Sequence, residues 1–522
     1  MSKKSKKKPP SGQSVASKLY SSLGAHKLER GKLLPPLNRM EKMRSSSWRN
    51  DHLPPMLWAA LLAEVFPRED FLGCLRDILK TCATWFSKGG PLAPTDLPPP
   101  DDGDINFTSV LDMQTLAQMP DALFSAFVKI PMRHPLGYAA LRPLLLLESV
   151  QAVERWRACL ATAPQEGDWE TMARAVAATL DHQSQRSTDI RWFKMMTPIV
   201  AGTMHFPETM AEKVREFYEY PNRGDQRSVR PSIRANEMML RRTPVSSWVG
   251  AFWKECATRT ACVDPTDFDR ERRTSTALSP ETVFRTRDSV IARFFQNQSS
   301  TEVDARLDSA FGLVLYGLAI VQEISIAGMH EDIMGRLALR SLVENVITLN
   351  YLAHKDDATL WSSWRVYGAG QAKLAFLRIQ ELAGDAPKFY EATELERIAN
   401  EDQWQEFLNI DIGHWDRTNL RTLARESNCI QLYESFYSWT SSFSHSHWGS
   451  VRDTNFITCQ NPLHRLHRIP RLVHRRSSSV EADAADLVNG ILDVLERLFP
   501  NGDRLHRLEL TVSPVSPEGD VG

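Results

Sequence analysis

The feature of this sequence that most constrains its fold is a helical spacing of apolar residues that runs almost without a break from Thr301 to about Phe499. Apolar residues recur there at intervals of three and four, which places them on one side of an α-helix. The chain shows neither regularly spaced runs of alternating β-branched residues nor strands that alternate with helices, and no fixed-period repeat is visible. We therefore predict an all-α, multi-helix fold.

The length of the chain predicts more than one domain. A single hydrophobic core stops growing at roughly 250–300 residues, and this chain has 522. Proline-rich and charged stretches interrupt the helical pattern and suggest where the domains end. We predict at least two helical domains in this order: a disordered basic tail over residues 1–44, an N-terminal helical domain over 45–220, a mixed linker region over 221–300, a C-terminal helical domain over 301–505 and a flexible tail over 506–522.

Local signals place some elements of the N-terminal domain. The stretch from Ser45 begins with Ser, Asn and Asp, continues with a proline pair and then has apolar residues at helical spacing, so it predicts two helices broken near Pro67. The stretch GGPLAPTDLPPPDDGD, from Gly89, carries too many prolines for regular structure and is expected to form a surface loop. Helical patterns resume near Met113.

The charge balance excludes a strong overall field. Lys and Arg number 63 against 64 Asp and Glu, so the global charge does not indicate binding to nucleic acid or to a membrane surface. A balanced total charge is compatible with a local basic surface, such as the N-terminal run KKSKKK. For this run we prefer the interpretation of a solubilising tail. The most apolar window, Ala310–Val321, is far shorter than the roughly 20 apolar residues of a membrane helix, so no membrane span is predicted.

The seven cysteines are odd in number, scattered and without a CxxC pair. This pattern is typical of reduced thiols in a cytoplasmic protein rather than of a disulfide framework or a structural zinc site. The basic N-terminus is not followed by an apolar stretch, which argues against a secretory signal. We predict a cytoplasmic location.

The standard motifs of several enzyme classes are missing. No GxxxxGK[ST], no GxGxxG after a strand, no HExxH and no GxSxG occurs, so nucleotide-binding loops, zinc proteases and ordinary serine hydrolases have no positive signal. His445 and His447 suggest metal binding, but residues two apart on a helix point to different sides, which disfavours a shared ion. The sequence predicts no cofactor and no metal site.

A histidine-rich and arginine-rich run, NPLHRLHRIPRLVHRR, contains His464, His467 and His474. Its charges could contact the phosphate groups of a nucleic acid. More often such a run is a solvated face or loop, because short patterns of this kind produce many false positives. We prefer the second interpretation.

A polar pair lies within the apolar segment EDIMGRLALRSLVENVITLNYLAHKDD. This segment is apolar nearly all round when it is placed on a helix, which predicts a buried central helix. Arg340 and Glu344 are four residues apart on one face of it, and we expect both to be buried. A buried charge must pair, meet polar groups on another helix or line a wet cavity. A buried ion pair that only fixes helix register is an alternative of equal weight.

A second segment, NLRTLARESNCIQLYESFYSWTSSFSHSHWGSVRD, places four polar residues at intervals of four along a helix: Tyr433, Tyr437, Ser441 and His445. A histidine near a carboxylate can act as a general acid or base, and an arginine beside it can hold an anionic group bidentately. Ser441 precedes His445 by one turn and could form a hydrogen bond with it. A satisfied core histidine is at least as good an interpretation of His445.

These two segments carry a resemblance. The Arg-x3-Glu of LRSLVENVITLNYL, the following helix WSSWRVYGAGQAKLAFLRI and the Tyr-x3-Ser-x3-His of LYESFYSWTSSFSH resemble an uncharacterised bacterial all-helical family, catalogued as domain of unknown function five-six-seven-seven, over roughly residues 304–448. The resemblance implies a shared polar site made of five residues: Arg340, Glu344, Tyr437, Ser441 and His445.

Helical families of this kind often look like components of phage-defence or toxin systems. Some contain ribonuclease domains in which an Arg is followed by four to six residues and a His. The chain departs from that pattern, because no such Arg lies between Arg425 and His445, and the one match, from Arg468 to His474, is interrupted by Pro470. The departure weakens a ribonuclease interpretation.

Two hypotheses of different classes remain. The first is an enzyme of a bacterial defence or stress system that acts on nucleic acid or a nucleotide, with His445 as acid or base, Arg340 holding phosphate, Glu344 orienting one of them, and Ser441, Tyr437 and Tyr433 as support. It predicts that Arg340, Glu344 and His445 converge around an open pocket. The alternative is a non-enzymatic interaction, sensor or scaffold protein with a protein partner.

The alternative hypothesis predicts an exposed apolar or aromatic patch of more than a few hundred Å². We expect such a patch near Trp48 and Trp58, where the N-terminal domain begins with a tryptophan-rich stretch. Neither the reaction nor the oligomeric state follows from the sequence.

Overall fold

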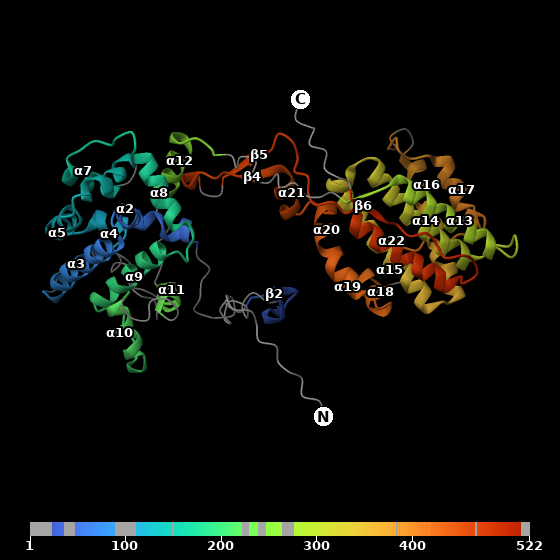
Figure 1. The fold of residues 1–522 in the computed structure, drawn as a ribbon, viewed down its shortest axis with the longest axis horizontal. Coiled ribbons are helices and arrows are strands. Elements are labelled where there is room, and N and C mark those ends of the chain that lie inside the picture. The colour runs from blue at the N-terminus through green and yellow to red at the C-terminus, as the bar shows by residue number, and fades with distance from the viewer. Residues whose placement is uncertain are drawn as a thin grey trace. The chain divides into compact units, whose positions relative to one another are not determined.

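The computed structural model describes residues 23–35, 47–88, 111–148, 151–221, 229–237, 247–263, 276–382, 385, 387–416, 418–464 and 467–512. Helices make up most of these residues, and within them strands occur as three two-stranded sheets (Figure 1). The sheets pair β1 (Lys27–Glu29) with β2 (Lys32–Leu34), β3 (Thr276–Leu278) with β6 (Leu510–Val512), and β4 (Phe456–Thr458) with β5 (Arg468–Pro470). The predicted all-α fold is confirmed.

The chain divides into two compact units. Unit 1 comprises Met1–Asp264 and Thr458–His467, and unit 2 comprises Pro265–Ile457 and Arg468–Gly522. The change from one unit to the other after Asp264 falls within the stretch 221–300, which the sequence marks as a mixed linker region. The return of residues 458–467 to unit 1 has no signal in the helical pattern of the sequence.

Unit 1 is built from short helices around one apolar core. Its α-helices are α2 (Leu57–Val65), α3 (Arg68–Ser87), α4 (Met113–Gln118), α5 (Asp121–Met132), α6 (Gly137–Leu141), α7 (Gln151–Leu160), α8 (Asp168–Leu180), α9 (Gln185–Val200), α10 (Ala211–Glu219), α11 (Arg230–Glu237) and α12 (Ser247–Arg259). The π-helix η3 (Trp48–His52) and the 3₁₀ turns η1 (Leu23–Ala25), η4 (Pro54–Met56), η6 (Arg142–Leu146), η7 (Glu208–Met210) and η13 (Pro462–His464) complete it.

The local signals of the N-terminal domain agree with the structure where it is described. Helix α2 ends at Val65 and α3 begins at Arg68, so the predicted break near Pro67 is confirmed. Helix α4 begins at Met113, and the side chain of Asp112 caps it by accepting a hydrogen bond from the backbone N–H of Thr115 (2.8 Å). The predicted proline-rich loop from Gly89 lies outside the described residues.

The prediction of an exposed aromatic patch at Trp48 and Trp58 is wrong. Trp48 is 5% exposed and Trp58 is fully buried. Trp58 packs edge-on against Phe127, with ring centroids 5.0 Å apart, and its indole N–H donates to the backbone carbonyl of Leu111 (3.0 Å). The tryptophans therefore belong to the core of unit 1, where their polar N–H can be satisfied by backbone.

Unit 2 is built around two long helices, α14 (Ala305–Ile326) and α15 (Ile333–Lys355). The other α-helices are α13 (Pro280–Asn297), α16 (Ala358–Leu382), α17 (Ala392–Ala399), α18 (Leu420–Glu426), α19 (Ile430–Leu432), α20 (Ser438–Ser444), α21 (Trp448–Asn455) and α22 (Glu481–Leu498). The π-helix η12 (Tyr433–Tyr437) joins α19 to α20, and η9 (Met329–Glu331) and η11 (Gln405–Phe407) are 3₁₀ turns.

Helix α15 is the central helix that its sequence predicts. It packs against α22, α14, α20 and α18, and Leu342, Val343 and Ile347 are fully buried. It ends where Asp356 adopts a left-handed conformation, with His354 and Lys355 in its last turn favourably placed for the helix dipole.

Helix α14 is the one described helix that is long and apolar enough, by length and composition, to cross a membrane. Half of its apolar window is buried within unit 2, where it packs against α13, α15, α16 and α22. A core helix passes the same test of length and composition. The expectation that the chain has no membrane span therefore stays a prediction.

Candidate functional site

Arg340 lies on α15 and contacts the segment formed by η12 and α20. Its Nη2 donates to the hydroxyl group of Tyr437 (2.8 Å), and its Nη1 donates to Oγ of Ser444 (3.0 Å). The same Nη2 lies 3.1 Å from Oε1 of Glu344, one turn further along α15. Together with Tyr433, which stacks on Tyr437, these residues form what we call the Arg340 cluster.

The two tyrosines of the cluster bracket the π-helix η12. The rings of Tyr433 and Tyr437 stack with centroids 4.7 Å apart and an interplanar angle of 17°. The guanidinium carbon of Arg340 lies 5.0 Å from the centroid of the Tyr437 ring, within the range of a cation–π contact. π-helical turns are rare and frequently occur at functional sites, which makes this segment a candidate site.

The expected burial of Arg340 and Glu344 is wrong. The side chain of Arg340 is 24% exposed and that of Glu344 is 42% exposed. Helical spacing correctly put them on one face of α15, but that face meets the short η12 segment rather than a full-length helix, so its edge stays open. The buried arginine of this helix is Arg336, whose Nη1 donates to the backbone carbonyl of His330 (3.1 Å).

Ser441 and His445 do not join the Arg340 cluster in the described structure. Helix α20 ends at Ser444, and His445 follows it with φ −102° and ψ 11°, so the predicted stripe of residues four apart stops there. The His445 ring is exposed and lies against His447, with centroids 5.8 Å apart. The Ser441 hydroxyl group is buried and makes no hydrogen bond within the described residues, so its predicted bond to His445 is absent there.

Two polar residues at or near the cluster have no clear signal in the sequence. Ser444 lies beside the predicted stripe of residues four apart, yet it binds Arg340 directly. His414 lies near Glu344 from a segment without helical spacing, and partial burial lowers its pKa against the opposing effects of Asp416 and Glu344. A conformation outside regular helices leaves no periodic signal, so His414 could be found only in the structure.

The electrostatics of the cluster keep Arg340 charged. Partial burial disfavours its positive charge, but the hydrogen bond to Tyr437 and the nearby Glu344 raise the pKa of Arg340 above its ordinary value. The cluster thus offers one permanent positive charge, hydroxyl groups from Tyr437 and Ser444, and a pair of stacked aromatic rings. This set can bind an anionic group and pack against a planar one.

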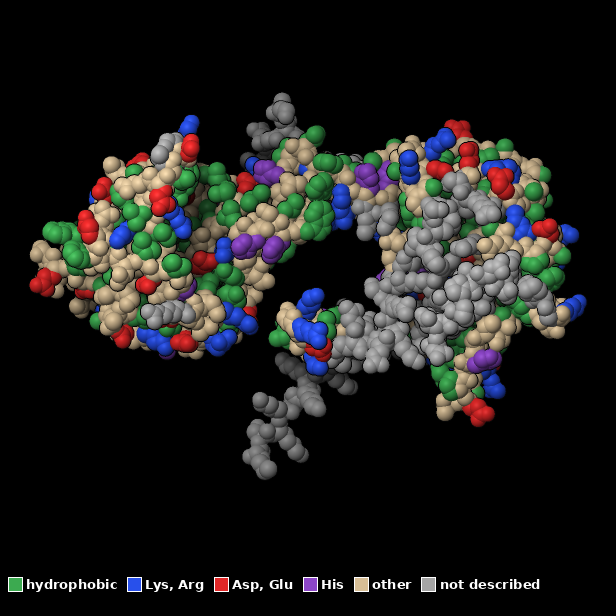
Figure 2. Space-filling view, turned by 180° about the vertical axis from the view of Figure 1, so that it is seen from behind, with side chains coloured by type: hydrophobic (Ala, Val, Ile, Leu, Met, Phe, Trp, Pro, Cys, Tyr) green, Lys and Arg blue, Asp and Glu red, His purple; other side chains and the backbone are tan. Residues whose placement is uncertain are grey.

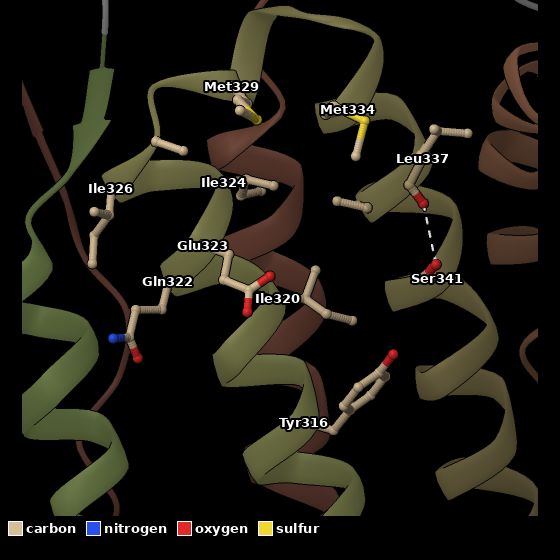
Figure 3. Close-up of a pocket in the computed structure, with 12 residues that line it drawn as sticks. Tyr316, Ile320, Gln322, Glu323, Ile324, Ile326, Met329, Met334, Leu337 and Ser341 are labelled. Atoms are coloured by element: carbon tan, nitrogen blue, oxygen red, sulfur yellow. Dashed lines mark hydrogen bonds between the residues drawn. The ribbon is translucent and has the colours of Figure 1, made fainter. Parts of the chain in front are cut away.

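A separate pocket of about 610 Å³ lies between α14 and α15 (Figure 3). Its walls are mainly apolar: Tyr316 and Ile320 project from α14, and Met334 and Leu337 lie on α15. Tyr316 is 59% exposed and Met334 is 52% exposed, so the pocket is an open groove. Ser341 lies at its edge, where its hydroxyl group donates to the carbonyl of Leu337 (3.2 Å).

Unit 2 is therefore a predominantly helical unit with a half-open arginine–tyrosine cluster and an apolar groove on its central helices. Residues 310–462 match the model of a family of unknown function, DUF5677. The match confirms the resemblance predicted from the sequence, over less than a third of the chain. No curated protein and no solved structure matches the chain.

Proposed function

We propose that unit 2 binds a phosphate-bearing ligand, of the nucleic-acid or nucleotide class, at the Arg340 cluster, and that the protein is a cytoplasmic effector of a bacterial stress or defence system. The observation that carries this proposal is the Arg340 guanidinium group. Tyr437, Ser444 and Glu344 hold it in one orientation, while 24% of the side chain stays exposed. A charge that is both fixed and accessible is suited to an anionic ligand.

Replacement of Glu344 by a phosphate group is energetically easy. An exposed ion pair between residues four apart on a helix contributes only about 0.3–0.5 kcal/mol. Hydrogen bonds from a guanidinium group to phosphate are charge-assisted and can be bidentate, so a phosphate can take the place of Glu344 beside Arg340. The stacked rings of Tyr433 and Tyr437 would then lie next to the bound group, where a nucleobase can stack.

The catalytic part of the proposal rests on His445. It follows Ser444 directly in the chain, and its exposed ring is free to approach a ligand bound at Arg340. We assign it the role of general acid or base, with Glu344 orienting the histidine once phosphate has taken its place beside Arg340, and with Tyr437 and Tyr433 as supporting residues.

The distribution of charged side chains on the surface favours contact with a few phosphate groups rather than with a long stretch of nucleic acid. On the described part of the face seen in Figure 2, basic and acidic side chains are interspersed over both units. The chain as a whole is also close to neutral, with 63 basic and 64 acidic residues. A nucleic acid would therefore be held at few phosphates, and its binding should depend only weakly on salt.

The first experiment measures binding of a fluorescein-labelled single-stranded RNA and of nucleoside triphosphates to the purified chain by fluorescence anisotropy. Arg340→Ala should weaken binding by about 10-fold or more, because hydrogen bonds to a charged group contribute roughly 1.5–3 kcal/mol. Arg421→Ala removes an exposed arginine of α18 and is the matched control. Equal binding by native chain and folded Arg340→Ala protein would refute the proposal.

A second experiment tests activity in cells. The chain is induced in a bacterial host, and growth and sequenced RNA are followed for the native form, Arg340→Ala and His445→Ala, with the exposed His506→Ala as control. Loss of toxicity or of RNA cleavage in both site variants supports an enzyme. Unchanged behaviour in both folded variants contradicts one.

The groove between α14 and α15 favours a second candidate function, that of a non-enzymatic helical interaction or scaffold protein. An open apolar groove of this kind accepts the apolar face of a partner helix. Met334 is 52% exposed, so the charge that Met334→Glu places in the groove should leave the fold intact. A cellular effect that Met334→Glu abolishes and His445→Ala leaves unchanged would select this second function over the first.

A further inference from the structure

Two cysteines and two histidines meet in unit 1, whereas the Arg340 cluster belongs to unit 2. Cys262 lies just beyond the end of α12, and the others lie in the returning segment 458–467. The ligand atoms of Cys262, Cys459 and His464 all lie within 4.8 Å of one another. His467 brings its Nε2 to 3.9 Å from the sulfur of Cys262. We call these four residues the Cys2His2 cluster.

The distances from His464 to the two sulfurs match those of a tetrahedral metal site, and the exposed His467 can supply the fourth ligand by turning its ring toward the other three. Nδ1 of His464 lies 3.5 Å from Sγ of Cys262 and 3.4 Å from Sγ of Cys459. Zinc binds sulfur at about 2.3 Å and imidazole nitrogen at about 2.0–2.1 Å, which at a tetrahedral angle puts the two ligand atoms about 3.5 Å apart. The observed sulfur-to-nitrogen distances of 3.4, 3.5 and 3.9 Å surround this value.

Surrounding groups orient His464 for such a role. Its Nε2 lies 3.1 Å from the backbone carbonyl of Thr260 and 2.9 Å from the hydroxyl group of the same residue. A carbonyl group can only accept, so it favours the tautomer with the proton on Nε2 and leaves the lone pair of Nδ1 directed at the two sulfurs. Metal-binding histidines are commonly held in this way by a backbone carbonyl.

Backbone groups likewise prepare the sulfur of Cys459. The N–H groups of Val263 and Asn461 donate to it at 3.3 and 3.4 Å. These two donors hold the sulfur of Cys459 in place beside Cys262 and His464. The side-chain amide of Asn461 also donates to the carbonyl of Ala261 (2.8 Å), which fixes the returning segment to the end of α12.

From this geometry we propose that unit 1 binds one zinc ion through two thiolates and two imidazoles, those of Cys262, Cys459, His464 and His467. Zinc replaces the two thiol protons, which are released, and the resulting site is electrically neutral. Four protein ligands leave no open position, so the ion is structural. It joins two chain segments whose ligands Cys262 and His464 are 202 positions apart.

The proposed site uses His464 and His467 of the run NPLHRLHRIPRLVHRR, for which the sequence alone favours a solvated face or loop. His464 is only 6% exposed and Cys459 only 4%, whereas Cys262 and His467 lie at the surface. One side of the cluster is thus enclosed and the other admits the ion. Sequence spacing could indicate the site only in part, because Cys459, His464 and His467 lie close together in the chain, whereas Cys262 is distant and no CxxC pair is present.

The test uses the untagged full-length chain, purified without chelators, and measures zinc by inductively coupled plasma mass spectrometry. We expect about one zinc per native chain and a loss of at least 10-fold in Cys262→Ser and in His467→Ala. Both residues are exposed, so their substitution leaves the core intact. The matched controls are two exposed residues of the same unit, Cys159→Ser and His205→Ala, which should keep the metal.

Cobalt substitution tests the geometry separately. Co²⁺ bound at the cluster should give the visible bands of a tetrahedral ion and a sulfur-to-cobalt charge-transfer band, both lost in Cys262→Ser. A native chain that contains no zinc and takes up neither Zn²⁺ nor Co²⁺ would overturn the proposal. So would equal metal content in Cys262→Ser and Cys159→Ser, or a native mass that shows a disulfide between Cys262 and Cys459.

Discussion

Replacement of Glu237 by glutamine should strongly destabilise unit 1. Glu237 ends α11 and is fully buried. Its Oε1 lies 2.5 Å from Nζ of Lys194 and 2.9 Å from Nδ1 of His52, and its Oε2 lies 3.2 Å from Nη1 of Arg191. One carboxylate therefore compensates two buried cations and one buried imidazole.

The magnitude follows from what the substitution leaves behind. Lys194 is 8% exposed and Arg191 is 4% exposed, so both positive charges would stay buried without a counter-ion. Removal of one partner from a buried ion pair costs about 3–5 kcal/mol. Burial acts to raise the pKa of Glu237, but Lys194, His52 and Arg191 together hold it far below its ordinary value.

Hydrogen exchange followed by mass spectrometry can measure this loss within one unit. Amides of α9, which carries Lys194 and Arg191, should lose protection by roughly 10²- to 10³-fold or more, since each 1.4 kcal/mol corresponds to a factor of ten. Amides of α15 in unit 2 serve as the internal reference. Glu154→Gln, at a residue whose side chain is 66% exposed, should change protection of α9 less than threefold. If Glu237→Gln also changed protection of α9 less than threefold, the reasoning would be refuted.

Three further predictions concern stability. Burial and the neighbouring Lys194 lower the pKa of His52 below its ordinary value of 6.5. As pH falls below 6.5 the unfolded chain therefore binds more protons than the folded chain, and unit 1 should lose stability. His52→Gln should reduce this pH dependence in hydrogen-exchange measurements. Ile347→Ala should destabilise unit 2 by about 2–5 kcal/mol in urea titrations and leave exchange in unit 1 unchanged, because Ile347 is fully buried in the core of unit 2. Gly137→Ala should lower the melting temperature, because a Cβ atom there would lie 2.2 Å from the carbonyl oxygen of Pro131; an unchanged melting temperature would contradict this.

Much of the fold follows from local patterns in the sequence. The apolar spacing predicts α15 as a central helix because burial on nearly every side requires apolar residues on nearly every side. Pro67 predicts the break between α2 and α3 because it cannot donate the hydrogen bond that would continue the first helix. The return of residues 458–467 to unit 1 depends on contacts between distant segments, and no local pattern records them.

The candidate site is predictable only in part, for a related reason. Spacing places Arg340 and Glu344 on one face of α15, but it does not say which element covers that face or how completely. The sequence predicts His445 on a helical stripe because α20 has no proline or glycine that would mark its end at Ser444. The Cys2His2 cluster has a still weaker signal, since its first ligand, Cys262, and His464 lie 202 positions apart.

The π-helices η3 and η12 each contribute to one of the two polar clusters described above. Each brings an aromatic ring over an arginine: Arg191 lies 4.8 Å from the ring of Trp48, and Arg340 lies 5.0 Å from that of Tyr437. The two clusters differ in access, because the side chain of Arg191 is 5% exposed and that of Arg340 is 24% exposed. Loss of Arg191 should therefore appear mainly as lost stability, whereas loss of Arg340, whose ion pair is weak, should leave the fold intact and remove ligand binding. If Arg340→Ala instead destabilised unit 2 as severely as Ile347→Ala, the Arg340 cluster would be a packing device like that of Arg191, and the ligand would have to be sought in the groove between α14 and α15.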